Sequence, residues 1–254
     1  MYPMNQDQHR WFLSDRVRMA MDWKNTDQNR GIKPPPIQKP VSDDARRIDL
    51  NGPDKWGDIK EVSLISAIAN RQSRRMYSGA PLTLDELSFL LWATQGVREV
   101  AGPFAVPRTV PSAGCRHSLE TYLAILNIEG VDPGIYRFLP LEHQLVLVRE
   151  DKNLGSSLVD ATLGQTFCGK SAVTFIWTTI PHRMEWRYGL AAHRVILIDA
   201  GHVGQNLYLG CEAIGAGTCT VGAYNQTLMD ELLGVDGDNE LTLYLAPVGK
   251  VRQK

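Results

Sequence analysis

The sequence contains no apolar run of the roughly 18 residues that a membrane-spanning helix needs. Its first residues, MYPMNQDQHRWF, also lack the apolar stretch of a secretory signal peptide. Its four cysteines and six histidines form neither a CxxC nor an HExxH motif. We therefore expect a cytoplasmic protein with reduced thiols, no membrane contact and no metal centre.

An excess of charge of one sign is also missing. The 27 Lys and Arg residues balance 28 Asp and Glu residues, which gives a net charge of −1. Non-specific binding to nucleic acid or to an anionic membrane depends on an excess of basic residues, so the balance argues against both partners. No GxSxG motif of a serine hydrolase occurs either.

The glycines of GAGTCTVG, at 215–222, do not form a dinucleotide-binding loop. Such a loop follows a strand and opens a helix, with glycines spaced as GxGxxG. Here the glycines follow a predicted helix and lead into a strand-like run. The pattern argues against a Rossmann site for an ADP moiety and leaves a mononucleotide site open.

The first 60 residues differ in composition from the rest of the chain. The segment 31–40, GIKPPPIQKP, holds four prolines in ten residues and favours an extended polyproline conformation. Trp11, Phe12 and Trp23 precede it. We expect residues 1–60 to form an N-terminal arm that packs on the body or on a partner subunit, and residues 61–254 to form the globular domain.

The pattern from residue 61 onward predicts both helices and strands. Thr83 and Glu86 form a capping box at the start of a helix over 83–96. A second, long helix over 193–215 is apolar nearly all round and should be buried. Strands are predicted within 120–130, 144–150, 172–179 and 240–247. The order of elements predicts an α+β fold, with a mixed central sheet flanked by helices.

Positive charge is concentrated in NRQSRRMYSG, at 70–79, where three arginines surround one serine. Alternate residues of an extended segment share a face, so Arg71, Ser73 and Arg75 would line one side. Two guanidinium groups and a hydroxyl suit the oxygen atoms of a phosphate. A solvated basic turn is the alternative that the spacing leaves open.

A second stretch, RTVPSAGCRHSLETY at 108–122, offers small side chains and backbone donors. Pro-Ser-Ala-Gly at 111–114 would let a planar ring lie against the backbone. Arg116-His117-Ser118 is predicted to open a helix, whose N-terminus favours electron-rich atoms. The small residues from Thr218 to Ala223 could contact the ring from the other side.

Together these stretches resemble the nitroreductase family of FMN enzymes, specifically its SagB-type, thiazole- and oxazole-forming dehydrogenase branch. The matching stretches occur in the family order across roughly residues 60–250; they are RQSRRMYSGAPLTLDELSFLLWATQG, RTVPSAGCRHSLETYLAILNIEGVDPGIYRFLPLEHQL, WRYGLAAHRVILIDAGHVGQNLYL and GAGTCTVGAY. The resemblance implies a nitroreductase-like FMN fold and a homodimer with FMN bound across the subunit interface. It also implies NADH or NADPH as the hydride donor.

The resemblance implies which residues hold the phosphate end of FMN. Arg71 and Ser73 match contacts to the phosphate and the ribityl chain, with Gln72 between them. Arg75 matches a basic residue under the pyrimidine edge of the flavin, where a cation favours the negative charge of the reduced ring. Lys250 and Arg252 resemble the C-terminal basic residues that close on the phosphate.

The resemblance also implies which residues surround the flavin ring. Gly222 and Ala223 fall where the family offers backbone N–H groups to flavin N5, and Gln165 is a candidate for the ring edge. Tyr188 is a candidate proton donor. The segment that lies against the ring from the other subunit corresponds to Pro111, Ser112, Ala113 and Gly114. Further candidates for the pocket lining are Trp186, His117 and Tyr224.

Two departures from the family pattern keep other functions open. Azoline dehydrogenases of this branch carry a Lys-Tyr pair before a glycine, whereas this chain has Arg187-Tyr188. Arginine keeps its proton and cannot act as a base, which argues against azoline oxidation. Cys115 stands where other nitroreductases often carry asparagine.

We therefore expect an FMN-dependent oxidoreductase that passes hydride from a reduced nicotinamide, through flavin N5, to an electron-poor nitro, quinone or enone compound. One alternative is a peptide azoline dehydrogenase, and another is a non-catalytic flavin-binding or redox-sensing protein. A third is a dimeric interaction module that uses the aromatic arm 1–30 as its contact surface.

Overall fold

The computed structural model describes residues 5–57, 59–99, 102 and 106–252. Within these residues, a seven-stranded sheet has the order β1-β4-β3-β2-β5-β7-β6. The strands are β1 (Arg47–Asp49), β2 (Leu119–Ile125), β3 (Gly134–Leu139), β4 (Gln144–Glu150), β5 (Val173–Thr179), β6 (Ala216–Thr218) and β7 (Leu241–Lys250). All neighbouring strands of this sheet pair antiparallel.

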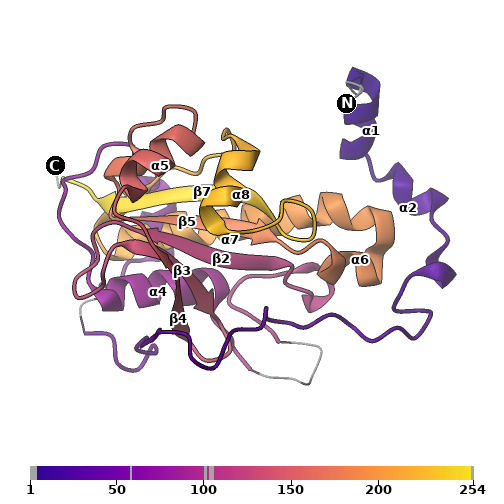
Figure 1. The fold of residues 1–254 in the computed structure, drawn as a ribbon, viewed down its shortest axis with the longest axis horizontal. Coiled ribbons are helices and arrows are strands. Elements are labelled where there is room, and N and C mark those ends of the chain that lie inside the picture. The colour runs from indigo at the N-terminus through magenta and orange to yellow at the C-terminus, as the bar shows by residue number, and fades with distance from the viewer. Residues whose placement is uncertain (1–4, 58, 100–101, 103–105, 253–254) are drawn as a thin grey trace.

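Helices cover both faces of the sheet (Figure 1). Helices α4 (Leu84–Gln95) and α7 (Ala192–Ala213) share one hydrophobic cluster with one face, whereas α5 (Leu154–Ala161) and α8 (Gln226–Leu233) share another with the opposite face. The two clusters divide β2 by alternation, since Leu123 belongs to the first and Tyr122 and Ala124 to the second. The remaining helices are α1 (Gln6–Leu13), α2 (Arg16–Ala20), α3 (Leu64–Asn70) and α6 (His182–Tyr188).

The predicted α+β class is confirmed, and the capping box of Thr83 and Glu86 is present at the start of α4. The sheet is antiparallel instead of mixed, because parallel pairing is confined to isolated bridges such as Ser73 with Thr218. Strand β3 was not predicted. It is fully buried, and Arg137 in its middle interrupts the apolar pattern that signals a buried strand.

The prediction that a helix begins at Arg116-His117-Ser118 is wrong. Gly114, Cys115 and His117 all adopt positive φ angles, of 57°, 55° and 45°. Arg116 between Cys115 and His117 is right-handed, with φ −86°, but a single such residue does not form a helix. The chain therefore passes from the short 3₁₀ helix η2 (Ala113–Cys115) directly into β2.

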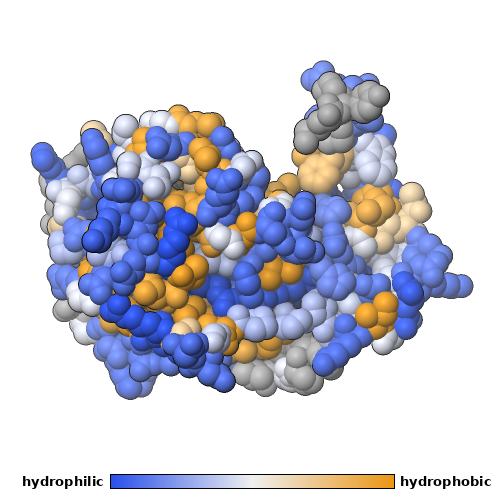
Figure 2. Space-filling model, in the orientation of Figure 1, coloured by the Kyte–Doolittle hydropathy of each residue, from blue (hydrophilic) through white to orange (hydrophobic). Residues whose placement is uncertain are grey.

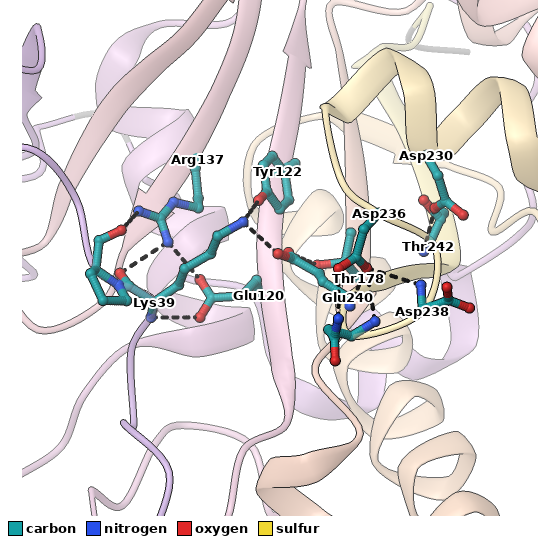
Figure 3. A network of polar contacts seen from close by, with 12 residues as sticks. Lys39, Glu120, Tyr122, Arg137, Thr178, Asp230, Asp236, Asp238, Glu240 and Thr242 are labelled. Atoms are coloured by element: carbon teal, nitrogen blue, oxygen red, sulfur yellow. Dashed lines mark hydrogen bonds and ion pairs between the residues drawn. The ribbon is translucent and has the colours of Figure 1, made fainter.

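The predicted arm, residues 1–60, has one part that packs on the body and a beginning that projects from it. Residues 47–49 form β1 and pair with β4, so they belong to the sheet. Lys39 is also fixed on the body (Figure 3): its backbone N–H donates to Glu120 at 3.0 Å and its ammonium group to Glu240 at 2.5 Å. Arg137 donates to the carbonyl oxygens of Lys39 and Pro40. Residues 39–40 and 47–49 of the predicted arm are thus packed on the body.

Only the beginning of the arm projects from the body (Figure 1). No residue of α1 or α2 is buried, and Trp11, Phe12 and Leu13 are exposed. Figure 2 shows apolar side chains on the surface of this projecting part. These exposed residues give α1 an apolar side that no other described residue covers. An eight-residue helix is marginal in water without tertiary packing.

Helix α7 confirms the predicted long helix and carries an exposed apolar strip. Leu197 and Ile198 are 46% and 47% exposed in the first third of this 22-residue helix. A Cβ atom added to Gly201 on the same exposed side would meet no atom within 4 Å. On the buried side, a Cβ on Gly210 would lie 3.1 Å from Leu90 of α4. The exposed strip is thus accessible to the backbone of another chain.

Candidate functional site

A basic pocket of about 610 Å³ lies beside the edge of the sheet formed by β6 and β7. The segment from Ser73 to Tyr77 runs along this edge, where the backbone N–H of Arg74 donates to the carbonyl oxygen of Thr218 at 2.8 Å. Two glycines permit the close approach. A Cβ on Gly217 would lie 2.5 Å from the Arg74 side chain, and one on Gly249 would lie 2.7 Å from the Tyr77 ring. The residues lining the pocket are Gln72, Ser73, Arg74, Arg75, Met76, Tyr77, Val251 and Arg252.

The pocket carries positive charge that no nearby carboxylate balances. In the part of the chain that the structure describes, neither Arg75 nor Arg252 forms an ion pair. The Arg75 guanidinium lies 5.9 Å from the centre of the Phe167 ring. No acidic residue lines the pocket. Two guanidinium groups and the Ser73 hydroxyl therefore suit an anionic group with several oxygen atoms, such as a phosphate.

Arg71 lies apart from this lining, against Tyr208 of α7. Its guanidinium carbon is 5.2 Å from the centre of the Tyr208 ring. The Tyr208 hydroxyl lies 3.0 Å from Ser73 Oγ and accepts the backbone N–H of Thr220 at 3.1 Å. Tyr208 thus links the predicted segments 71–75 and 218–223. No sequence pattern distinguishes Tyr208, because a tyrosine in a long apolar helix looks like an ordinary core residue.

The segment of Gly222 and Ala223 presents backbone donors to solvent. Both residues are exposed, and the space above Gly222 is open, since an added Cβ would meet no atom within 4 Å. No hydrogen bond from either backbone N–H is found among the described residues. Gln165 holds the segment through a bond from its Nε2 to the Ala223 carbonyl oxygen at 2.8 Å. Gln165 therefore lies beside Ala223, and Phe167, two residues further along the chain, lies beside Arg75.

Lys250 does not reach the basic pocket. Its ammonium group donates to the Glu86 carboxylate, and to the carbonyl oxygen of Ile214 at 2.6 Å. Glu86 is also the carboxylate of the capping box that starts α4. Lys250 therefore joins β7 to α4. Of the two C-terminal basic residues that the resemblance selected, Arg252 lines the pocket and Lys250 does not.

A second candidate surface is built around Pro111, Ser112, Ala113 and Gly114. Ser112 Oγ donates to Asp199 of α7 at 2.6 Å, and the backbone N–H of Ala113 donates to the same carboxylate at 3.4 Å. Burial raises the pKa of Asp199, although its hydrogen bonds from Ser112 and Ala113 oppose the shift. Gly114 has a positive φ angle of 57°, and its surroundings leave no room for a side chain. An added Cβ would lie 2.7 Å from the Tyr188 hydroxyl and 2.9 Å from Arg187 Cδ.

Buried cationic side chains lie behind this surface. The Arg116 guanidinium packs over the Trp186 ring at 4.8 Å, and its Nε donates to the carbonyl oxygen of Arg183. His117 is nearly buried; burial, together with the charges of Arg108, Arg116 and Arg183, lowers its pKa to about 3. The imidazole is therefore neutral at physiological pH. Its Nε2 lies 3.6 Å from Cys115 Sγ.

The aromatic residues predicted to line the pocket have other positions. Trp186 is buried and donates from Nε1 to the carbonyl oxygen of Ile32, so it holds the arm on the body. Tyr224 donates to the carbonyl oxygen of Thr242, and burial raises its pKa to about 12. Of the predicted aromatic residues, Tyr188 is the one whose hydroxyl reaches the surface at Gly114.

The two candidate surfaces contact opposite sides of α7 in a single chain. Ser112 binds Asp199, and Ser73 lies against Tyr208, nine residues further along the helix. Nine residues correspond to about 2.5 helical turns and roughly 13 Å along the axis. One chain alone therefore does not bring the segment 111–114 over its own basic pocket.

The described residues contain neither a membrane-spanning helix nor a cluster of metal ligands. No helix within the described ranges is long and apolar enough to cross a bilayer. The same residues contain no group of three or more His, Cys, Asp or Glu side chains that could hold a metal ion.

Comparisons with known proteins agree on one family. The family model described as "Nitroreductase family" matches residues 68–250. A protein of Methanocaldococcus jannaschii named as a nitroreductase is 36% identical over 193 residues, which are 76% of this chain and 93% of the relative. A solved structure from Ralstonia eutropha, also named as a nitroreductase, has a TM-score of 0.67 at 26% identity and covers 88% of this chain and 97% of its own.

A further relative is named as a processing protein. The trifolitoxin-processing protein of Rhizobium leguminosarum bv. trifolii is 24% identical over 163 residues, or 61% of this chain. The match covers 44% of that protein, so the chain spans less than half of its length.

Proposed function

Because the chain belongs to the nitroreductase family, we propose that it is an FMN-dependent oxidoreductase. In this proposal a reduced nicotinamide is the electron donor and an electron-poor nitro, quinone or enone compound is the acceptor. The observation that carries the proposal is the unbalanced basic pocket of Ser73, Arg75 and Arg252. Tyr208 joins Ser73 to Thr220, and the exposed N–H groups of Gly222 and Ala223 follow Thr220 in the chain.

The residues fit the two ends of FMN. The resemblance assigned Arg75 to the pyrimidine edge of the flavin, but Arg75 lines the same pocket as Ser73 and Arg252. We therefore propose that Arg75, Arg252 and the Ser73 hydroxyl hold the phosphate, because forked cationic donors match its oxygen atoms. The exposed N–H groups of Gly222 and Ala223 would donate to the edge of the ring system, with Gln165 fixing their position. FMN bound here would supply two-electron hydride chemistry that no side chain of this protein provides.

Each side chain has a definite task in this arrangement. Tyr208 orients Ser73 and Thr220, so that the phosphate and ring contacts keep a fixed spacing. Asp199 fixes Ser112 and Ala113, which keeps the segment 111–114 flat against a ring. Tyr188 would hold a proton at its hydroxyl, beside Gly114, and could donate it to the reduced acceptor.

The proposal includes a homodimer. The segment 111–114 and the basic pocket lie on opposite sides of α7, so a complete site needs the segment from a second chain. The exposed strip of Leu197, Ile198 and Gly201 on α7 is the surface that supports such pairing. In a two-fold dimer the same patch faces its own copy, and one interface then completes both sites.

We expect Leu197→Glu to convert the dimer into monomers. A carboxylate in the middle of the paired strip would be desolvated without a partner, which weakens association at least tenfold. Light scattering during size-exclusion chromatography measures the mass directly. Leu141→Glu changes an exposed leucine on a different surface and should leave the mass unchanged. A monomeric wild-type protein would contradict the dimer.

Membership of the SagB-type branch remains part of the proposal. The trifolitoxin-processing relative supports it, because its name links a similar chain to the processing of a toxin. Arg187 argues against azoline oxidation by this chain, since a guanidinium stays protonated and cannot remove a proton. A loss of two hydrogen atoms from an azoline peptide, detected by mass spectrometry, would favour the peptide dehydrogenase instead.

The decisive experiment is anaerobic reduction of the purified protein. We expect a yellow protein whose visible flavin absorbance is bleached by NADH or NADPH and restored by nitro, quinone or enone acceptors. Bleaching without reoxidation by any of these acceptors would favour a redox-sensing role. A colourless protein that does not take up added FMN would contradict the proposal.

A further inference from the structure

We propose that Arg187 and Tyr188 form a carboxylate-binding subsite against Gly114, and that the acceptor reduced by this protein carries a carboxylate group. The inference rests on the proposed oxidoreductase function and names the chemical class of its substrate. It concerns recognition of the acceptor by this chain's own side chains.

The position of Arg187 is defined by its neighbours. Its Cδ and Nε lie 2.9 Å from the point where a Cβ of Gly114 would be, so any larger residue at position 114 would displace it. Its guanidinium carbon lies 5.6 Å from the centre of the Tyr188 ring. The Tyr188 hydroxyl approaches the same point above Gly114, at 2.7 Å. The cation and the hydroxyl, both at the end of α6, are therefore adjacent and lie against Gly114 of the segment proposed to contact the flavin ring.

The charge of Arg187 is not balanced by the protein. Arg187 is exposed, and within the described residues no hydrogen bond or ion pair joins its guanidinium to a carboxylate. The carboxylate nearest to it along α6 is Glu185, which binds His193 Nε2 at 2.7 Å. The fork of donors on Arg187 thus remains available to a ligand.

The surroundings add further positive charge. Arg116, Arg183 and Arg108 lie behind this surface, and Glu120, which pairs with Arg183, also pairs with Arg137. Arg108 Nε and Arg183 Nη1 are buried without a hydrogen-bond partner among the described residues. Burial first, and the charge of Arg187 second, lower the pKa of Arg116. An anion bound at Arg187 would relieve this repulsion.

The geometry favours a carboxylate. Arginine presents two parallel N–H groups that match the two oxygen atoms of a carboxylate, whereas a lysine is a single point charge. The Tyr188 hydroxyl can donate a further hydrogen bond to the same group. Binding of the carboxylate would fix the orientation of the rest of the acceptor over Gly114.

The first test compares two acceptors that differ in one group, 4-nitrobenzoate and 4-nitrobenzamide. We expect the wild-type protein to prefer the benzoate by about 10- to 100-fold in kcat/KM, with most of the difference in KM. Arg187→Gln should bring this preference close to one, and Arg187→Lys should keep part of it. Arg149→Gln, which removes an exposed arginine of β4, is the matched control and should leave the preference unchanged.

The second test does not require turnover or flavin. Phenylglyoxal modifies exposed arginines, and mass spectrometry reports the modification at each site. Benzoate should slow the modification of Arg187 by several-fold, whereas benzamide should not, and neither should affect Arg149. Benzenesulfonate and inorganic phosphate as competitors show whether the site prefers a carboxylate over other anions.

The outcomes separate this inference from the proposed function. Protection of Arg187 by benzoate supports the subsite even if the protein fails to retain FMN. Equal modification with and without benzoate overturns it, as does an unchanged benzoate preference in Arg187→Gln. Stronger protection by phosphate than by benzoate would also overturn the assignment to a carboxylate.

Discussion

Replacement of both Arg75 and Arg252 by alanine is expected to weaken FMN binding by roughly two to four orders of magnitude. Each guanidinium would contribute a charge-assisted bond to the phosphate, and each such bond contributes about 1.5–3 kcal/mol. Both side chains line the basic pocket, and no ion pair competes for them within the described residues. Titration of the apoprotein with FMN, followed by the quenching of flavin fluorescence, measures the dissociation constant.

Two controls make this result specific to the phosphate. Arg46→Ala with Arg149→Ala removes the same amount of charge from a surface around β4 and should leave the dissociation constant unchanged. Riboflavin lacks the phosphate, so it should bind the wild type and the pocket variant with similar affinity. Arg71→Ala and Ser73→Ala should have smaller effects singly, because Arg71 packs on Tyr208 instead of lining the pocket. An unchanged FMN affinity in the pocket variant would mean that the phosphate binds elsewhere.

The largest effect on stability is expected from Glu120→Gln. Glu120 is 4% exposed and pairs with two buried arginines, Arg183 at 2.6 Å and Arg137 at 3.6 Å. Removal of one partner from a buried ion pair leaves uncompensated charge and costs about 3–5 kcal/mol. The variant keeps the shape of the side chain, so its effect reports the charge. Urea denaturation monitored by circular dichroism gives the free energy of unfolding.

The same carboxylate also holds the N-terminal segment, because it accepts the backbone N–H of Lys39 (Figure 3). We therefore expect Glu120→Gln to increase proteolysis near residues 37–40 as well. Glu142→Gln is the matched control, since Glu142 is exposed and contacts Gln38 of the same segment. It should change the free energy of unfolding by less than about 0.5 kcal/mol. Equal stability of both variants would show that the buried charges are compensated in another way.

Local patterns in the sequence predicted those parts of the fold that depend on local interactions. The capping box at Thr83 and Glu86, the long helix that became α7 and four of the strands were all recognisable, because burial imposes a period on neighbouring residues. Strand β1 was not recognisable. Its three residues gain their conformation from pairing with β4, about 100 positions further along the chain.

The candidate site was predictable only in part, for a similar reason. Ser73, Arg75 and Arg252, which the resemblance selected, line one pocket, and Gln165 contacts Ala223. Their contacts to FMN stay a prediction. Lys250 did not follow the expectation, because Glu86 is close enough to bind its ammonium group. Nothing in the local sequence signals such a long-range contact, and the same applies to the role of Tyr208.

The opposite placement of Asp199 and Tyr208 on α7 has a thermodynamic consequence for the proposed dimer. If each cofactor is enclosed by two chains, release of FMN and dissociation of the chains are linked equilibria. Dilution would then loosen the cofactor, and saturating FMN would hold the chains together at concentrations where they otherwise separate. The amount of protein in the cell would thereby help to set how much of it carries flavin.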